Sequence, residues 1–291
     1  MMIDPHLTRY ALMGVFFLFG MVFGSFGNVV IWRLPRKESL SFPPSHCPIC
    51  GSPIKPYDNI PVLSYLLLGG KCRTCHEAIS VRYPLVELLG GVLFAVAVLI
   101  GTNLVQAIFL SAFLYLLMLL SFIDYDTKRL PNSLVAVLGV FGLTAIVLAL
   151  IPGSTSTLVQ STSLVKTAAL TASAQRAPLG PIAEGALGLL FTAGPATLIA
   201  LLYRALRHKS GFGMGDIKLL VVIGLFLGRF GGLVLPVAAI LGLIALIGAK
   251  LGNRRVSLSM KIPFGPFIAL ATLVILMFGQ SIWIWYIGLL F

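Results

Sequence analysis

Long apolar runs are the feature that most constrains what this chain can fold into. A helix needs roughly 20 predominantly apolar residues to cross the hydrocarbon core of a bilayer. Hydrophobic residues make up 58% of the chain and charged residues only 10%, whereas soluble domains carry about 25% charged residues. The sequence therefore predicts an all-α polytopic membrane protein with about eight transmembrane helices, at residues 10–31, 83–100, 104–123, 133–151, 183–203, 217–228, 232–249 and 264–288.

The basic residues indicate a topology for these runs. The first run lacks a basic leader and a small-residue cleavage site, so we expect a retained helix rather than a removed signal peptide. If the loop after it is cytoplasmic, all but four of the 21 Lys and Arg residues fall on the cytoplasmic side, the exceptions being Arg9, Lys166, Arg176 and Arg229. This positive-inside bias places both termini outside. The same bias accounts for the net charge of +12, because basic loops on the inner side are attracted to anionic lipids. The charge therefore does not indicate a nucleic-acid partner.

Polar segments divide the chain into three parts. Residues 1–31 hold the first transmembrane helix, and residues 32–82 form a cytoplasmic loop rich in Pro, Gly and Cys. Residues 83–291 hold the other apolar runs, interrupted by an outer loop at 152–182 that is rich in Ser, Thr and Ala. We find no clear internal repeat in the sequence.

All four cysteines lie in the cytoplasmic loop, as two CxxC pairs. The pairs are Cys47-Pro-Ile-Cys50 and Cys72-Arg-Thr-Cys75, a pattern that sets four thiolates around a zinc ion. A disulfide is the alternative, but a reducing cytoplasm disfavours it. Four sulfur ligands leave no open position on the metal, so the pattern favours structural zinc. His46 and His76 flank the pairs, and we interpret them as solvated neighbours.

Three carboxylates lie at the ends of apolar runs, where an ionisable group indicates a functional site. Asp124 and Asp126 end the third run, and Asp216 begins the sixth. Two carboxyl groups brought close together share a proton, so that one accepts a proton from water while the other donates to a peptide carbonyl. Gly213 and Gly215 beside Asp216 let an extended substrate approach the backbone. In the alternative interpretation Asp216 is only a helix cap, and Asp124 or Asp126 pairs with a nearby Lys or Arg.

Five motifs carry a resemblance to a known family. They are GSFGNVVIWRLP after the first run, the whole cysteine loop from CPICGSP to PLVELLGG, IDYDTKRLPN, GMGDIKLL and IPFGPFIAL. On these motifs the chain resembles the type IV prepilin peptidases, which are GxGD-type membrane aspartic proteases. Members of this family are leader peptidases and N-methyltransferases of type IV pilus and type II secretion systems.

The resemblance implies a membrane aspartic endopeptidase that cleaves the basic leader of type IV prepilins or pseudopilins and then methylates the new N-terminus using S-adenosylmethionine. It also implies a multi-pass protein of the bacterial inner membrane whose active sites face the cytoplasm. The family's first catalytic aspartate stands six residues before a Leu-Pro or Ile-Pro, which matches Asp124 and Leu130-Pro131, and its second is the GxGD aspartate, Asp216. Asp126 stays an alternative, because Tyr125-Asp126 resembles the YD motif of presenilin-type proteases.

The family pattern associates methyl transfer with the cysteine loop. No Rossmann-type glycine signature is present, so the sequence does not locate the S-adenosylmethionine site. Gly70, Arg82 and Glu87 are candidates for cofactor binding because they fall in matching motifs, as do the plausible wall residues Asn28, Arg33, Tyr57, Asp58, Asn59 and Tyr83.

Two other functions remain open at this point. The first is a peptidase whose zinc loop is purely structural, without methyl transfer. The second is a transporter or assembly scaffold that uses its intramembrane charges for ions, although the broken inverted repeats common in transporters are not evident.

Overall fold

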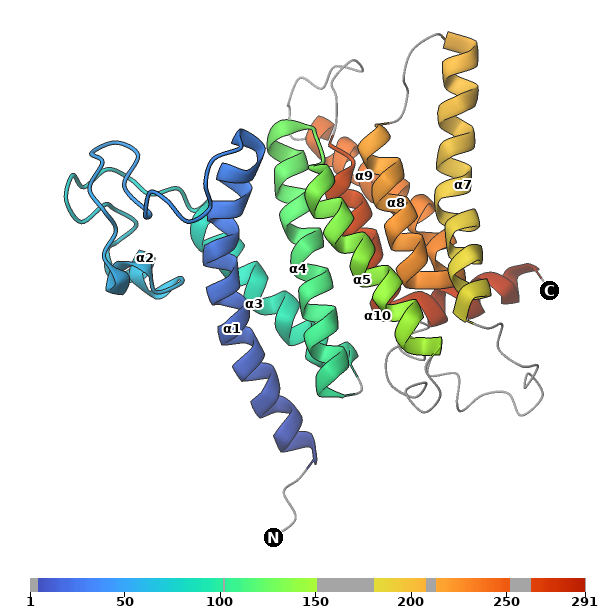
Figure 1. Cartoon of the computed structure of the whole chain (residues 1–291), viewed down its shortest axis with the longest axis horizontal. Helices are drawn as coiled ribbons and strands as arrows, with labels where there is room; N and C mark the ends of the chain where they lie inside the picture. The colour runs from blue at the N-terminus through green and yellow to red at the C-terminus, as the bar shows by residue number, and fades with distance from the viewer. Residues whose placement is uncertain (1–4, 102, 151–180, 208–212, 252–262, 291) are drawn as a thin grey trace. The chain divides into compact units, whose positions relative to one another are not determined.

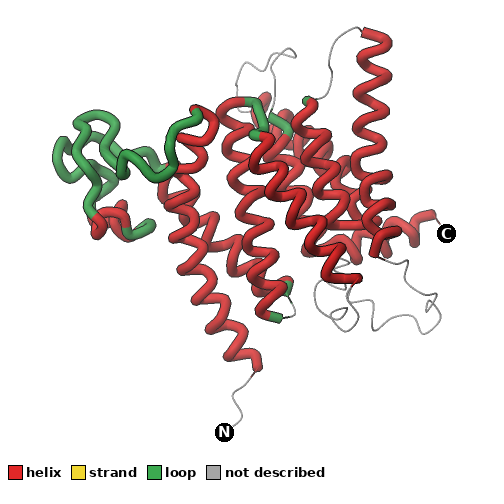
Figure 2. The backbone as a smooth tube through the Cα atoms, viewed as in Figure 1, coloured by secondary structure: helices red, strands yellow, loops and turns green. Residues whose placement is uncertain are grey.

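The computed structural model describes residues 5–101, 103–150, 181–207, 213–251 and 263–290. All regular structure in these ranges is helical, and the longest described stretch without a long helix is the cysteine loop (Figure 2). The predicted outer loop at 152–182 lies outside the described residues, except for its last two positions. The chain divides into two compact units, residues 1–119 and 120–291, and each is described by itself.

Each of the eight predicted apolar runs coincides with a helix (Figure 1). These helices are α1 Pro5–Arg33, α3 Arg82–Ile100, α4 Leu104–Thr127, α5 Asn132–Leu150, α7 Pro181–Arg207, α8 Met214–Leu227, α9 Val234–Leu251 and α10 Gly265–Leu290.

The number of membrane crossings is a separate question from the number of helices. Within the described residues, five segments are long and apolar enough to cross a membrane, namely Leu7–Arg36, Arg82–Ile100, Leu104–Thr127, Ile182–Arg207 and Met214–Leu251. The last combines α8, the short 3-10 helix η3 Gly228–Leu233, and α9, while the apolar stretches of α5 and α10 are shorter. The structure thus supports an all-helical chain with several membrane-spanning helices, and the count of eight stays a prediction.

In the first unit, α1 and α3 lie side by side with their backbones in direct contact (Figure 1). Gly20 and Gly24 on α1 face Gly90 and the Glu87 backbone on α3, and a Cβ on Gly24 would stand 2.7 Å from Glu87 Cα. Only a helix face without side chains permits this approach. The close packing brings the Glu87 side chain near Ser25 of α1.

In the second unit, α7 packs against α8 through a similar glycine contact. A Cβ on Gly188 would overlap the carbonyl oxygen of Gly224 and stand 2.9 Å from Gly228 Cα. Near the same end of α8, the Arg229 guanidinium donates to the Glu184 carboxylate of α7. Asp216 begins the opposite end of α8, so the glycine contact fixes the helix that carries it.

The glycine contact predicts a stability effect. Gly188→Ala should lower the free energy of unfolding by about 1–3 kcal/mol, because the added methyl overpacks the α7–α8 contact. Gly194→Ala on the same helix is the matched control, since its Cβ would meet only the Leu190 side chain at 3.9 Å. Thermal unfolding of the detergent-solubilised variants measures both. Equal stability of the two variants would contradict the packing analysis.

Candidate functional site

The structure brings Asp124 and Asp216 together in the second unit. Asp124 lies in the last turn of α4 and is only 5% exposed, and Asp216 lies in the first turn of α8 and is half-buried. The two carboxyl groups are close enough to interact electrostatically. Segments that are far apart in the sequence therefore form one pair of acidic groups.

Gly265 at the start of α10 completes the surroundings of Asp124. Its backbone N–H donates a hydrogen bond of 2.9 Å to Asp124 Oδ2, and this contact is buried. The first N–H groups of a helix have no partner within the helix, so they are available to an acceptor such as this carboxylate. A Cβ at position 265 would lie 2.8 Å from the same oxygen. The position therefore has little room for any side chain.

Sequence reasoning assigned no role to Gly265, because a backbone donor leaves no mark in a side-chain pattern. The available signal was the motif IPFGPFIAL itself, in which a glycine directly precedes a long apolar helix.

The glycines before Asp216 have different neighbours from those that we expected. We expected them to leave room for a substrate. A Cβ on Gly213 would lie 2.6 Å from Asp216 Oδ2, and a Cβ on Gly215 would lie 3.1 Å from Leu130 Cβ. Gly213 thus makes room for the Asp216 carboxylate itself, and Gly215 for the turn after α4.

That turn is fastened to α8 by a second contact. Lys218 Nζ donates to Asn132 Oδ1 at 2.9 Å, which joins the GDIK segment to the LPN segment. Lys128 takes a left-handed conformation with φ of 53°, and its N–H donates to the Asp124 carbonyl. These contacts hold the end of α4 against the start of α8, and with them the two aspartates.

Asp126 differs from Asp124 in its surroundings. It is exposed, as is Tyr125 at 65%, because helix positions two residues apart do not share a face. Of Asp124 and Asp126, the two candidates for the first aspartate, only Asp124 is buried.

The four cysteines form a compact cluster in the cysteine loop, residues 32–82. Their Sγ atoms all lie within 4.8 Å of one another, and those of Cys47 and Cys75 are 3.8 Å apart. A tetrahedral zinc ion with Zn–S bonds of about 2.3 Å separates its sulfur ligands by about 3.8 Å. Hydrogen bonds with the Ser52 side chain and backbone lower the pKa of the Cys50 thiol to about 6, whereas, despite a hydrogen bond with the Glu77 backbone, desolvation and the neighbouring thiols raise the pKa of the Cys75 thiol in the same cluster to about 12. The cluster fits zinc in donor type and spacing.

The two CxxC segments are structural repeats of each other, a feature that we did not find in the sequence. Cys47 N–H donates to the Ser52 carbonyl at 2.9 Å, and Cys72 N–H donates to the Glu77 carbonyl at 2.8 Å. The residue that follows each second cysteine is left-handed, with φ of 69° at Gly51 and 59° at His76. His76 thus occupies a turn position that glycine fills in the first segment, which is a structural role rather than that of a ligand.

An ion pair joins the second CxxC segment to the middle of the loop. Arg73 donates two hydrogen bonds to Asp58, of 2.8 and 2.5 Å. These bonds hold the pKa of Asp58 below its ordinary value. Asp58 lies in the 3-10 helix η2 Pro56–Asn59, and its side chain is only 9% exposed against 52% for Arg73. The pair therefore fixes η2 relative to the cysteine cluster.

The three cofactor candidates from the sequence take part in separate contacts. Gly70 lies in the turn before Cys72 with φ of 69°, and its carbonyl accepts from Ile79 N–H at 2.7 Å. Glu87 is buried and accepts a hydrogen bond of 2.7 Å from the N–H of Val62. Val62 has φ of 61°, a strained value for a β-branched residue. Arg82 begins α3 and is half-buried.

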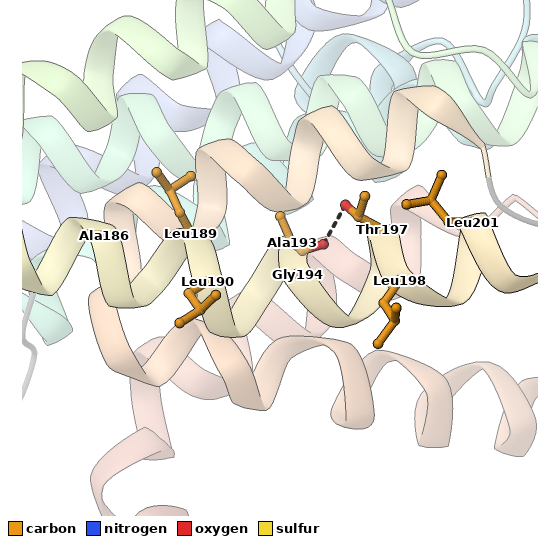
Figure 3. A pocket seen from close by; sticks show the side chains of 8 residues that line it. All are labelled: Ala186, Leu189, Leu190, Ala193, Gly194, Thr197, Leu198 and Leu201. Atoms are coloured by element: carbon orange, nitrogen blue, oxygen red, sulfur yellow. Dashed lines mark hydrogen bonds between the residues drawn. The ribbon is translucent and has the colours of Figure 1, made fainter.

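A shallow hollow on α7 offers no chemistry of its own. Its lining residues all come from α7 and run from Ala186 to Leu201 (Figure 3). The only polar side chain among them is Thr197, whose hydroxyl donates to the Ala193 carbonyl at 2.7 Å. No titratable group lines this hollow.

Helices that can span a membrane, with two aspartates brought together at helix ends, define a helical membrane protein with a candidate peptidase centre. The family model described as the bacterial peptidase A24 N-terminal domain matches residues 18–100, and that of the type IV leader peptidase family matches residues 111–249. No solved structure gives a significant match.

Curated relatives resemble almost the whole chain. A prepilin leader peptidase/N-methyltransferase of Aeromonas salmonicida is 34% identical over 94% of this chain and 92% of its own. Proteins of the same name from Neisseria gonorrhoeae and Pseudomonas aeruginosa are each 33% identical over 91% of this chain and 90% of their own. The chain therefore belongs to the type IV leader peptidase family. This confirms the predicted family and the prediction of an enzyme.

The cysteine geometry predicts the metal content. The purified protein should hold about one zinc ion per chain, and Cys47→Ser should lose most of it and make the loop sensitive to protease. Asp58→Asn should retain less zinc than the wild type, because η2 is no longer fixed to Arg73. His46→Gln is the control, since the His46 ring is hydrogen-bonded to the Pro44 carbonyl at 3.0 Å rather than to a cysteine, and it should leave the zinc content unchanged. Elemental analysis measures the metal, and an equal zinc content in Cys47→Ser and the wild type would contradict the assignment.

Proposed function

We propose that the protein cleaves the basic leader of a type IV prepilin or pseudopilin with an Asp124–Asp216 dyad and then N-methylates the new N-terminus. The observation that carries the proposal is the meeting of these two aspartates in one unit. The relatives named prepilin leader peptidase/N-methyltransferase support the substrate class and the second activity.

The surroundings of the two aspartates suggest which one holds the shared proton. A hydrogen bond from a backbone N–H favours the charged form of a carboxyl group, and Asp124 accepts one from Gly265. We therefore assign Asp124 as the unprotonated member and Asp216 as the protonated member before reaction. Two like charges side by side in an apolar site would repel, which favours this division.

Hydrolysis then follows with each group in one role. Asp124 accepts a proton from a water molecule while the water oxygen bonds to the scissile carbonyl carbon, and Asp216 donates its proton to the carbonyl oxygen. When the tetrahedral intermediate breaks down, the C–N bond cleaves and the proton held by Asp124 passes to the leaving amine nitrogen. The hydroxyl proton on the former carbonyl oxygen returns to Asp216, which restores the pair.

The proposed setting is the cytoplasmic face of the bacterial inner membrane. Eight membrane crossings with positive loops inside would place the end of α4 and the start of α8 at that face. The apolar helix of the substrate can stay in lipid while its basic leader reaches the cytoplasm, so we propose lateral entry from the bilayer. Anionic lipids are the expected surroundings of the basic loops.

We further propose that residues 1–31, 32–82 and 83–291 act as a first helix, a methyltransferase-associated zinc loop and a peptidase core. One zinc ion would be held by the four cysteines, Cys47, Cys50, Cys72 and Cys75. This zinc would stabilise the fold of the loop and would not activate water. S-adenosylmethionine is the proposed methyl donor. Transfer needs the amine lone pair aimed at the methyl carbon, which is mainly a task of positioning.

The dyad predicts the effect of three matched substitutions. Asp124→Asn and Asp216→Asn should each reduce prepilin cleavage by about 1,000-fold or more, because each removes one proton-transfer group. Asp126→Asn is the control and should stay largely active. The assay is cleavage of a purified prepilin in detergent, with the product mass resolved to one methyl group.

The product mass separates the activities. A cleaved product without the extra methyl group would leave a peptidase with a structural zinc loop. Full cleavage by all three variants would overturn the dyad and favour the scaffold interpretation.

The Gly265 contact predicts a further loss of cleavage. Gly265→Ala should lower kcat about 10- to 100-fold, since the added methyl displaces the Asp124 carboxylate and small displacements at a reacting centre have effects of this size. Gly242→Ala is the control in the same unit, because its Cβ would meet the Phe267 ring at 3.7 Å, an ordinary contact. Wild-type kcat in Gly265→Ala would show that this N–H does not position the aspartate.

A further inference from the structure

A half-enclosed cavity of about 550 Å³ lies in the first unit, between the second half of α1 and the cysteine loop. Its α1 wall comprises Val22, Ser25, Phe26, Val29 and Arg33, which lie on one face of the helix. The opposite wall is formed by residues 40, 41, 43–45 and 59–61 of the loop. Small-molecule sites in proteins have volumes of roughly 300–1,000 Å³, so the cavity has the size of a ligand site.

Arg33 supplies a buried positive charge to this cavity. Its side chain is 8% exposed, and its guanidinium donates to the Ser39 carbonyl at 3.0 Å and to the Pro43 carbonyl at 2.7 Å. Among the residues that the structure describes, no carboxylate lies within ion-pair distance of it. A guanidinium has five N–H donors, so further donors remain for an anion. A buried charge without a counter-charge is costly, and a bound carboxylate would offset this cost.

The other end of the cavity has the opposite character. Ser25 lines it and adjoins the buried Glu87 carboxyl group, which accepts a hydrogen bond from Val62 N–H. Ser25 and Arg33 are separated by about 12 Å along the helix, at roughly 1.5 Å per residue. The cavity therefore has a cationic end at Arg33 and an acidic group adjoining its other end.

The remaining lining suits a nucleoside. Phe26 and Val29 offer apolar surface on the helix side, while Asn59 and the hydroxyls of Ser41 and Ser45 offer hydrogen-bonding groups on the loop side. Pockets that bind small molecules combine apolar walls with a few polar groups in this way.

From this arrangement we propose that the cavity between α1 and the loop is the S-adenosylmethionine site, with Arg33 binding the carboxylate of the methionine part. The proposal rests on the proposed methyltransferase function. The sulfonium then lies toward Ser25 and Glu87, away from the like charge of Arg33. In the transfer the amine nitrogen lone pair bonds to the methyl carbon, and the C–S bond breaks with its electron pair going to sulfur. The product is the neutral thioether, and the amine proton passes to water.

The proposal changes the set of expected residues. Arg33 and Asn59 line the cavity, whereas Gly70, Arg82 and Glu87 do not. Glu87 becomes a positioning residue, because it adjoins Ser25 on one side and holds the strained Val62 on the other.

Binding of S-adenosylmethionine to the purified, zinc-loaded protein in detergent tests the site. Arg33→Gln keeps an amide that can donate to the loop carbonyls but removes the charge, and it should weaken the Kd at least about tenfold. The matched control is Arg36→Gln. Arg36 is exposed, lies 3.6 Å from the Trp32 ring centroid and donates to the Trp32 carbonyl. The Arg36→Gln variant should bind S-adenosylmethionine as tightly as the wild type does.

A second pair of variants separates ligand binding from folding of the loop. Val29→Trp adds an indole to the α1 wall of the cavity and keeps Arg33 itself, and it should abolish binding while the zinc content stays at the wild-type level. Val15→Trp on the exposed face of the same helix is its control.

Each outcome decides a different question. Unchanged binding in both Arg33→Gln and Val29→Trp would overturn the site while leaving the methyltransferase function in place. Failure of the wild type to bind S-adenosylmethionine or to methylate would instead overturn the proposed function. Loss of a co-purified anionic phospholipid from Arg33→Gln with unchanged S-adenosylmethionine binding, measured by native mass spectrometry, would assign the cavity to a lipid headgroup and overturn the proposal.

Discussion

The buried hydrogen bond from Gly265 N–H to the Asp124 carboxylate is the interaction on which the second unit depends. A carboxyl group in an apolar interior is stable only beside groups that offset its desolvation, and a backbone donor at a helix start does so without adding a further side chain. The start of α10 must then meet the end of α4. The start of α8 must also lie near the end of α4 so that Asp216 is close to Asp124. Gly213 and Gly215 permit this approach because they have no side chain. The three motifs are thus parts of one packing arrangement.

The cysteine loop is stabilised differently, because it has no apolar core of its own. The described parts of residues 34–81 contain only two short 3-10 helices and α2 Leu63–Leu67. Polar contacts fix the loop instead: the cysteine cluster, Arg73 to Asp58 within it, and Arg33 and Glu87 at its junction with α1 and α3. A buried residue of each helix therefore holds the backbone of the loop. These contacts hold the loop that forms one wall of the α1 cavity.

Much of the fold follows from the sequence because apolar helices are specified locally. Every predicted apolar run coincides with a helix, since length and hydropathy are properties of the segment alone. The pairing of Asp124 with Asp216 was predicted through motifs, because proximity between remote residues is not encoded in spacing. The features that sequence reasoning missed depend on the backbone. They are the Gly265 N–H donor, the left-handed turn at His76 and the space that Gly213 leaves for the Asp216 carboxylate. Backbone groups are the same in every residue, so only tertiary structure reveals which of them act.

The two proposed reactions make different demands on the protein, and the two units differ accordingly. Peptide hydrolysis needs proton transfer, which the second unit supports with paired carboxyl groups. Methyl transfer needs an amine with a free lone pair, and an ordinary N-terminal amine has a pKa of about 7.7–8.0, so a useful fraction is already neutral near pH 7. Deprotonation then adds only about 1 kcal/mol to the barrier, whereas correct orientation of two reactants contributes about 7–11 kcal/mol. A methyltransferase of this kind needs rigid walls and a charge to orient the donor more than it needs a strong base. The cavity between α1 and the cysteine loop offers such a charge in Arg33, which is held by two carbonyl groups.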